Sequence, residues 1–210
     1  MKPNLNKGAD VTALSNKTLN YYSVHAVEFA KSTVDIEIRE IRERFTTLLA
    51  PGDRILDFGC GSGRDTKAFL DAGFNVTATD GSLEMCEYAE MLTGISVRNE
   101  LFQDLADVNA YDGIWACSSI LHLPKKQLAE VFARMARALC PHGIVYTSFR
   151  HGKFEGVQNG RYFTDFTKPA LRDFLANTAP EFTLKQLWST IDVRPSKKGV
   201  FWLNVILRKL

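Results

Sequence analysis

The sequence predicts an α/β fold, with a doubly wound, mostly parallel sheet and helices on both of its faces. One observation is the alternation of short apolar runs with segments of helical periodicity, which is typical of parallel βαβ units. Another is a glycine-rich turn directly after the first run, where residues 55–63 read Ile-Leu-Asp-Phe-Gly-Cys-Gly-Ser-Gly. The third is length, because 210 residues with 45% hydrophobic content can bury one sizeable core and favour one domain over two.

The expected elements follow from these patterns in chain order. Apolar residues recur at helical spacing between positions 34 and 48, with charged residues on the other face, which predicts one amphipathic helix covering the sheet. Segment 150–161, rich in glycine and polar residues, is expected to be a loop and a flexible lid. The strands are expected near 54–58, 75–79, 112–117, 143–149, 182–189 and 200–208, and the later helices near 64–72, 83–92, 125–139 and 168–177.

The glycine-rich turn predicts a nucleoside cofactor. Asp57 stands near the end of the first strand, and Gly59, Gly61 and Gly63 alternate with small residues, so ligand atoms can lie directly against the backbone. Asp80 closes the second apolar run, where a carboxylate can accept hydrogen bonds from both hydroxyls of a ribose.

Two other cofactor classes fit the turn poorly. A dinucleotide fingerprint needs a glycine where this chain has Arg64, which, with no credible second domain, disfavours a nicotinamide oxidoreductase. A P-loop needs Gly-Lys-Ser/Thr, whereas the chain continues Gly-Arg-Asp-Thr over residues 63–66.

On these residues the chain resembles the class I S-adenosylmethionine-dependent methyltransferases, as a small bacterial-type single-domain member. The family signature Asp/Glu-x-Gly-x-Gly-x-Gly, matched by Asp57, Gly59, Gly61 and Gly63, wraps the methionine end of the cofactor. The resemblance implies a seven-stranded sheet whose last strand is antiparallel beside the fifth, S-adenosylmethionine as cofactor with S-adenosylhomocysteine as product, and no metal. It also implies a helical cover over residues 1–50, a cofactor-binding core over 51–150 and a substrate-side part over 151–210.

The resemblance further implies cofactor contacts along the sheet edge. Family members carry an acid or amide after the third strand that reaches the adenine amino group, and of Gln103 and Asp104 the better candidate is Asp104. Asp57 and Asp80 could instead cap helices, and Asp104 could be a turn residue. The expected set is Asp57, Gly59, Cys60, Gly61, Gly63, Arg64, Asp80, Gly81, Ser82, Gln103, Asp104 and Cys117.

Candidate catalytic and substrate-binding residues lie outside the glycine-rich turn. His122 follows the fourth strand, beside the methyl group in the family, and could act as a general base or be a structural histidine. Tyr21 and Tyr22 precede a helix that closes over the cofactor in similar enzymes, or they form a core pair. Guanidinium groups in loops could bind a substrate carboxylate or phosphate, or be solvated; the candidates are Arg150, Arg161 and Arg194.

The main functional hypothesis is methyl transfer to a small molecule. The Asp/Asn-Pro-Pro-Tyr and Pro-Cys motifs of amino- and cytosine-C5 methyltransferases are absent after the fourth strand. One alternative is a tRNA wobble-base methyltransferase, because some share the Leu-His element at positions 121 and 122. The other is a non-catalytic S-adenosylmethionine-binding module, in which the glycines of the turn or the ribose-binding carboxylate would be expected to be replaced by other residues.

Composition predicts a cytoplasmic protein, monomeric or homodimeric, without membrane partners. The net charge of +2 gives no strong nucleic-acid signal. Residues 1–8 contain no apolar signal core, and no segment of about 20 apolar residues occurs. The four cysteines, Cys60, Cys86, Cys117 and Cys140, are too widely spaced to indicate a disulfide framework or a zinc site.

Overall fold

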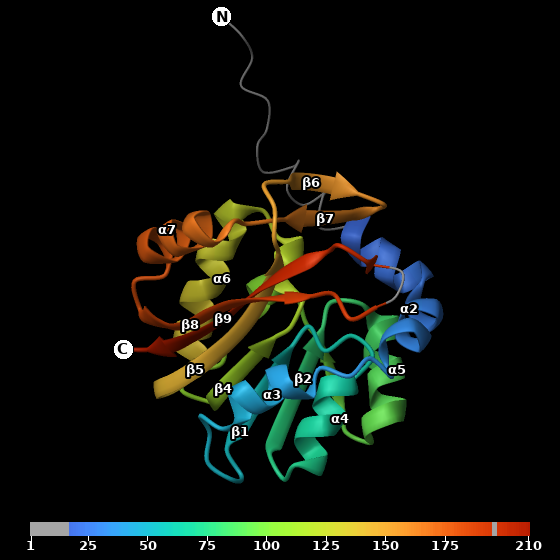
Figure 1. Cartoon of the computed structure of the whole chain (residues 1–210). Helices are drawn as coiled ribbons and strands as arrows, with labels where there is room; N and C mark the ends of the chain where they lie inside the picture. Colours follow the sequence, from blue (N-terminus) through green and yellow to red (C-terminus); the bar gives the residue numbers. More distant parts are fainter. Residues whose placement is uncertain (1–16, 195–196) are drawn as a thin grey trace, which may run out of the picture.

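A seven-stranded sheet forms the centre of the computed structural model, which describes residues 17–194 and 197–210 (Figure 1). Its strand order is β3-β2-β1-β4-β5-β9-β8. The first five strands pair in parallel, and β9 runs antiparallel to both β5 and β8, which confirms the predicted sheet and its antiparallel last strand. The strands are β1 (Arg54–Phe58), β2 (Asn75–Asp80), β3 (Val97–Asn99), β4 (Tyr111–Ala116), β5 (Leu139–Arg150), β8 (Phe182–Ile191) and β9 (Phe201–Lys209).

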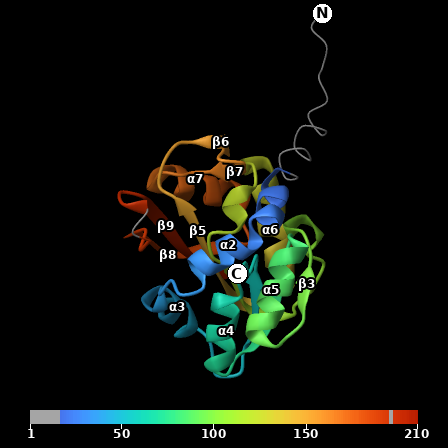
Figure 2. The ribbon, with the colours of Figure 1, turned by 90° about the vertical axis from the view of Figure 1, so that its right-hand side faces the viewer.

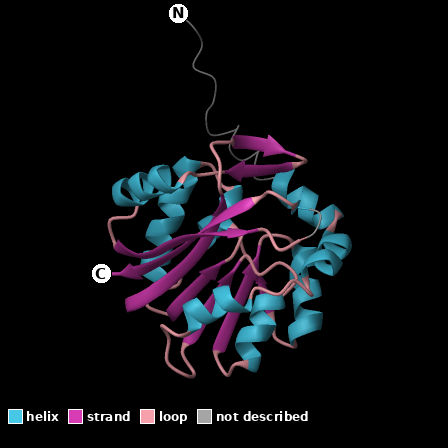
Figure 3. Cartoon of the chain, viewed as in Figure 1, coloured by secondary structure: helices cyan, strands magenta, loops and turns pink. Residues whose placement is uncertain are grey.

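Helices cover both faces of this sheet, as Figure 3 shows. Those that connect or follow the strands begin and end within two residues of the predicted positions. They are α4 (Arg64–Asp71), α5 (Leu83–Thr93), α6 (Lys125–Ala138) and α7 (Lys168–Thr178). Two short 3₁₀ turns, η1 (Phe102–Asp104) and η2 (Ile120–His122), lie after β3 and β4.

Side-chain alternation along β1 explains why both faces are buried. Leu56 and Phe58 pack into the cluster that contains α6 and α7, whereas Ile55 packs on the other face with Phe45 and Phe69. Figure 2 looks onto α3 (Arg39–Thr46), α4 and α5, which lie below α2 (Ala26–Thr33) in that view. With both faces covered, the carboxyl edge of the parallel strands is where a ligand can enter.

The single helix expected over positions 34–48 is wrong, because the chain forms α2 and α3 with a break between them. The break, residues 34–38, contains Val34, Asp35 and Ile36, three residues with weak helix preference. Only Phe45 of the predicted apolar stripe is fully buried, while Leu48 is exposed. The break lets α2 lie beside α5 while α3 packs through Phe45 on the sheet.

The loop expected over 150–161 is also wrong, because it contains the first strand of a β-hairpin. Strand β6 (Glu155–Gln158) pairs antiparallel with β7 (Arg161–Thr164). The two residues between them, Asn159 and Gly160, both have positive φ angles, 50° and 78°, as a two-residue hairpin turn requires. The backbone N–H of Tyr162 donates to Thr18 Oγ1 at 2.9 Å, so the hairpin is bound to the helical residues 17–24.

Several sequence predictions fall outside the described residues. They are the absence of a signal core in residues 1–8 and the first 16 residues of the expected N-terminal cover. Within the described ranges, no helix is both long enough and apolar enough to cross a bilayer.

Candidate active site

A cavity of about 1380 Å³ lies at the carboxyl edge of β1, β2, β4 and β5 and collects most of the predicted site residues. The N-terminal helical residues, the β6–β7 hairpin and the segment between β8 and β9 also contribute to its wall. The predicted residues that line it are Asp57, Gly59, Cys60, Gly61, Arg64, Asp80, Gly81, Gln103, Cys117, Tyr22, His122, Arg150, Arg161 and Arg194.

The glycine-rich turn offers its backbone to this cavity. Gly59 has a φ of +84°, and a Cβ there would lie 2.5 Å from Ser119 Cβ. Gly61 has a φ of +55°, and a Cβ there would meet no atom closer than 3.9 Å, so its open side leaves room for a ligand. A Cβ on Gly63 would instead lie 3.0 Å from Ala89 Cβ, so that glycine lets α4 and α5 pack closely and does not line the cavity.

Asp80 is held beside the turn by backbone hydrogen bonds. Its Oδ2 accepts from the Gly61 N–H and its Oδ1 from the Ser82 N–H, both at 2.9 Å. Burial raises the pKa of Asp80, and these N–H groups partly offset that effect. Each oxygen can accept a further hydrogen bond, which suits a vicinal diol. Ser82 itself caps α5 through Met85 N and does not line the cavity.

A buried ionic cluster centred on Asp65 forms another part of the cavity wall. Arg64 donates to both Asp65 oxygens at 3.0 and 2.7 Å, Arg42 donates at 3.0 Å, and Trp115 Nε1 donates at 3.0 Å. Burial alone would raise the pKa of Asp65, but Arg64, Arg42 and Trp115 hold it below its usual range. The sequence analysis missed Asp65, whose only local signal is its place beside Arg64.

Asp57 lies next to this cluster and behaves differently. Burial, together with the nearby negative charge of Asp65, raises the pKa of Asp57 to about 7. Thr66 Oγ1 donates to its Oδ2 at 2.6 Å. The cavity therefore contains a carboxyl group that titrates near neutrality and that a bound cation would favour in its ionised form.

A hydrogen-bonded Tyr22–His122 pair forms the opposite part of the wall. His122 Nδ1 lies 2.6 Å from the carbonyl oxygen of Tyr162, which can only accept, so Nδ1 carries the proton. His122 Nε2 is then an acceptor, and the Tyr22 hydroxyl donates to it at 2.8 Å. Burial lowers the pKa of His122 to about 4 and raises that of Tyr22. Both groups are therefore neutral at pH 7.

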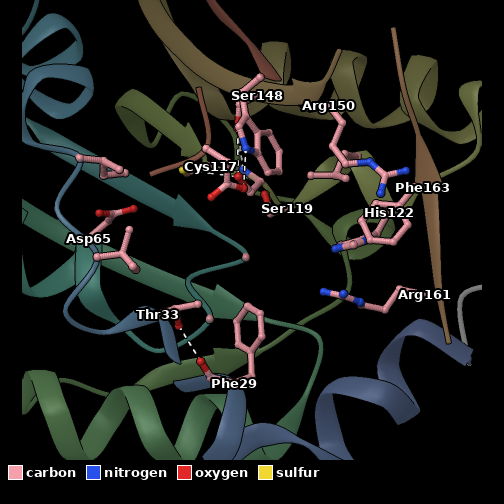
Figure 4. A pocket seen from close by; sticks show the side chains of 18 of the residues that line it. Phe29, Thr33, Asp65, Cys117, Ser119, His122, Ser148, Arg150, Arg161 and Phe163 are labelled. Atoms are coloured by element: carbon pink, nitrogen blue, oxygen red, sulfur yellow. Dashed lines mark hydrogen bonds between the residues drawn. The ribbon is translucent and has the colours of Figure 1, made fainter. Parts of the chain in front are cut away.

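The three predicted substrate arginines differ in their partners. Arg150 donates to Asp165 through Nε at 2.8 Å and through Nη2 at 3.2 Å, and Arg194 pairs with Asp192 at 2.8 Å (Nε) and 2.5 Å (Nη2). Arg161 has no carboxylate oxygen within 4.0 Å among the residues that the structure describes. Figure 4 shows His122, Arg150, Phe163 and Arg161 together on one side of the pocket and Asp65 on the other.

Two further predicted residues do not lie where they were expected. Asp104 is exposed and outside the cavity wall, whereas Gln103 lines it, because the η1 turn directs successive side chains to different sides. In this geometry Gln103, and not Asp104, lies where it could contact a ligand in the cavity. Tyr21 lies behind Arg161, with the guanidinium carbon 4.4 Å from its ring centroid, and does not line the cavity.

No cluster of three or more His, Cys, Asp or Glu side chains in the described ranges could hold a metal ion. The four cysteines are free thiols.

Comparison with known proteins identifies the core of the chain. A family model described as a methyltransferase domain matches residues 55–143. The YqeM protein of Bacillus subtilis (strain 168) is 34% identical over 109 residues, which cover 46% of this chain and 44% of that protein. The chain thus spans less than half the length of this curated relative.

Solved structures share the whole fold at low sequence identity. The 1,6-didemethyltoxoflavin-N1-methyltransferase of Burkholderia thailandensis, with bound 1,6-didemethyltoxoflavin and S-adenosylhomocysteine, superposes with a TM-score of 0.77 at 22% identity over 100% of this chain and 93% of that one. The [4+2]-cyclase SpnF superposes with a TM-score of 0.69 at 15% identity over 90% and 94%. Residues 55–143 therefore match a methyltransferase domain, and the chain has the fold of S-adenosylmethionine-dependent methyltransferases of known structure.

Proposed function

We propose that this protein transfers a methyl group from S-adenosylmethionine to a small-molecule acceptor. The observation that carries the proposal is a single cavity lined by the glycine-rich turn with Asp80 and also by the Tyr22–His122 pair. Its volume of about 1380 Å³ exceeds the roughly 300–1,000 Å³ of a pocket for one drug-sized ligand. The cavity therefore has room for a cofactor and an acceptor together.

The residues present fit the cofactor. The open side of Gly61 gives a ligand access to backbone, and the spare acceptor capacity of Asp80 suits a ribose diol. Asp57, with a pKa of about 7, would stabilise the ammonium of the methionine part by ionising beside it. Gly81, Leu101, Phe102 and Gln103 also line this part of the cavity and would surround the adenine.

We assign the parts of the chain accordingly. Residues up to 50 would act as the cover, residues 51–150 as the cofactor-binding core, and residues 151–210 as the acceptor side. The β6–β7 hairpin belongs to this last part, and its Arg161 and Phe163 line the cavity.

The chain's own residues would position the acceptor and exclude water. Bound S-adenosylmethionine supplies a methyl group already activated by its sulfonium. The Tyr22 oxygen can accept a hydrogen bond from the acceptor while its own proton stays on the His122 Nε2 side. Because the pKa of His122 is about 4, this pair is a weak base, so acceptors whose lone pair is already free are favoured over an ammonium.

Relatives support a small-molecule acceptor over tRNA. The Burkholderia neighbour contains a bound small heterocycle in its structure. Two of the cavity's arginines are neutralised by Asp165 and Asp192, which reduces the positive charge that a phosphate backbone would need.

The first test is calorimetric titration of the protein with S-adenosylhomocysteine, with NAD as the control ligand. We expect micromolar or tighter binding of S-adenosylhomocysteine and none of NAD. Asp80→Asn should weaken the binding by about tenfold or more, because a charged acceptor for ligand hydroxyls is lost. Asp71→Asn, a control on the exposed face of α4, should bind as the wild type does.

Turnover is tested separately by measuring S-adenosylhomocysteine formation from S-adenosylmethionine with a panel of small acids, phenols, amines and thiols. Binding without turnover on any acceptor would favour the non-catalytic module. Failure of the wild type to bind S-adenosylhomocysteine would refute the proposal.

A further inference from the structure

Arg161 is a cationic side chain in the cavity wall whose charge is not neutralised by the described residues. Its Nε is buried and has no hydrogen-bond partner, and its Nη1 makes only a long contact, 3.4 Å, to the Tyr22 hydroxyl. By contrast, Arg150 and Arg194 each donate hydrogen bonds from two nitrogens to the carboxylate of an aspartate. A partly buried guanidinium without a counter-charge is costly unless something else supplies one.

Aromatic rings hold this guanidinium without neutralising it. Its central carbon lies 4.4 Å from the ring centroid of Tyr21 and 5.2 Å from that of Phe163. Cation–π contacts hold an arginine in position, while the N–H groups at the edge of its guanidinium remain free to donate hydrogen bonds. The Tyr22 hydroxyl that Arg161 contacts is itself bonded to His122, which is neutral by its own hydrogen bonds.

Aromatic side chains form much of the wall on the side of Arg161, together with polar side chains such as Gln158 and Asn159. Phe154 and Phe163 come from the hairpin region, and Phe201 and Trp202 begin β9. Phe154 and Phe201 are 41% and 46% exposed, although large aromatic side chains usually bury more of their surface. A cavity wall that combines exposed rings with one unneutralised guanidinium suits a ligand with a flat apolar body and a single negative charge.

We propose that the acceptor is an aromatic carboxylic acid, whose carboxylate is bound by the guanidinium of Arg161. The fork of a guanidinium matches the two oxygens of a carboxylate. One arginine without a carboxylate partner among the described residues suits the single charge of a carboxylate. This inference rests on the proposed function in one respect, that the bound acid is the methyl acceptor.

The test compares two probes that share a naphthalene ring, the anionic 2-naphthoate and the neutral 2-naphthamide, by calorimetry on the full chain. Both are titrated with S-adenosylhomocysteine at saturation and again without it. We expect the wild type to bind naphthoate at least tenfold more tightly than naphthamide, as a charged hydrogen-bonded pair provides. Arg161→Gln should abolish this preference and leave naphthamide affinity unchanged. Arg172→Gln, a control on the exposed face of α7, should keep it.

The following results would contradict the proposed carboxylate site. Equal binding of the two probes by the wild type, binding of neither, or a preference that survives in Arg161→Gln would overturn the proposal. If Arg161→Gln does not fold, Arg161→Lys replaces it, and the preference should fall at least threefold because the planar fork is lost. If the wild type fails to bind S-adenosylhomocysteine, the proposed function fails, but the probe preference in the cofactor-free protein still tests the anion site alone.

Discussion

Replacing Asp65 by asparagine removes the carboxylate that two partly buried arginines share, Arg64 and Arg42, of which Arg42 also pairs with Glu37 at 2.6 Å. Arg64 and Arg42 make three hydrogen bonds to its oxygens, and the indole of Trp115 makes a fourth. Its side chain is 7% exposed, and those of Arg64 and Arg42 are 19% and 14% exposed. Breaking a buried ion pair by removing one partner costs about 3–5 kcal/mol, and we expect Asp65→Asn to lose this much free energy of unfolding.

The matched control is Asp112→Asn, which also breaks a two-pronged pair with an arginine. Arg54 and Asp112 are 48% and 27% exposed, so the loss there should be about 1 kcal/mol or less. Both variants are measured by urea unfolding at pH 7. Because the pKa of Asp65 is held below its usual range, its contribution is present above pH about 4 and is lost as the pH falls through the lowered value. A loss below about 1 kcal/mol for Asp65→Asn would refute this account of the cluster.

Three other changes test the titrating groups of the cavity. Tyr22→Phe leaves the buried Nε2 of His122 without its donor and should cost about 1–3 kcal/mol in urea unfolding; no loss would mean that the pair does not form. His122→Gln should remove a pH dependence, because a histidine pKa lowered from 6.5 to about 4 gives stability that is complete above pH 6.5 and lost by about 3 kcal/mol as the pH falls to 4. A wild-type profile matching that of the variant over this range would contradict the lowered value. Asp57→Asn should remove a pH dependence of the opposite sign. Because the pKa of the Asp57 carboxyl is raised to about 7, the wild type should lose stability as the pH rises from about 4 to 7, and the variant should not. The same slope in both proteins would show that Asp57 does not titrate there.

The sequence predicted best what depends on short-range patterns. The parallel strands are buried on both faces, so they appear as apolar runs, and the predicted starts and ends of β1 and α4 lie within one residue of the observed ones. The glycine-rich turn is equally local, because its positive φ angles at Gly59, Gly61 and Gly63 depend on residue type at fixed spacing.

The sequence predicted poorly what depends on tertiary partners. Apolar spacing alone could not show that the helix over 34–48 breaks, since the break is set by how α2 and α3 pack on different parts of the molecule. The hairpin did have a local signal, the Asn-Gly pair at 159–160, which outweighs the loop-like composition around it. The lack of a carboxylate partner for Arg161 among the described residues had no local signal, because only the fold shows which arginines meet an aspartate.

The two parts of the cavity differ in how the chain builds them. The proposed cofactor side comes from turns that follow β1 and β2, so its residues lie near one another in the sequence and are fixed by the core of the sheet. The proposed acceptor side joins distant segments: Tyr22 bonds His122 across 100 positions and contacts Arg161 across 139. No hydrogen bond or ion pair joins Arg161 to Asp80 among the described residues, and the effects of substitutions at separated sites add approximately. We therefore expect a substitution at Arg161 to change the ligand bound on the proposed acceptor side more than the affinity for the proposed cofactor.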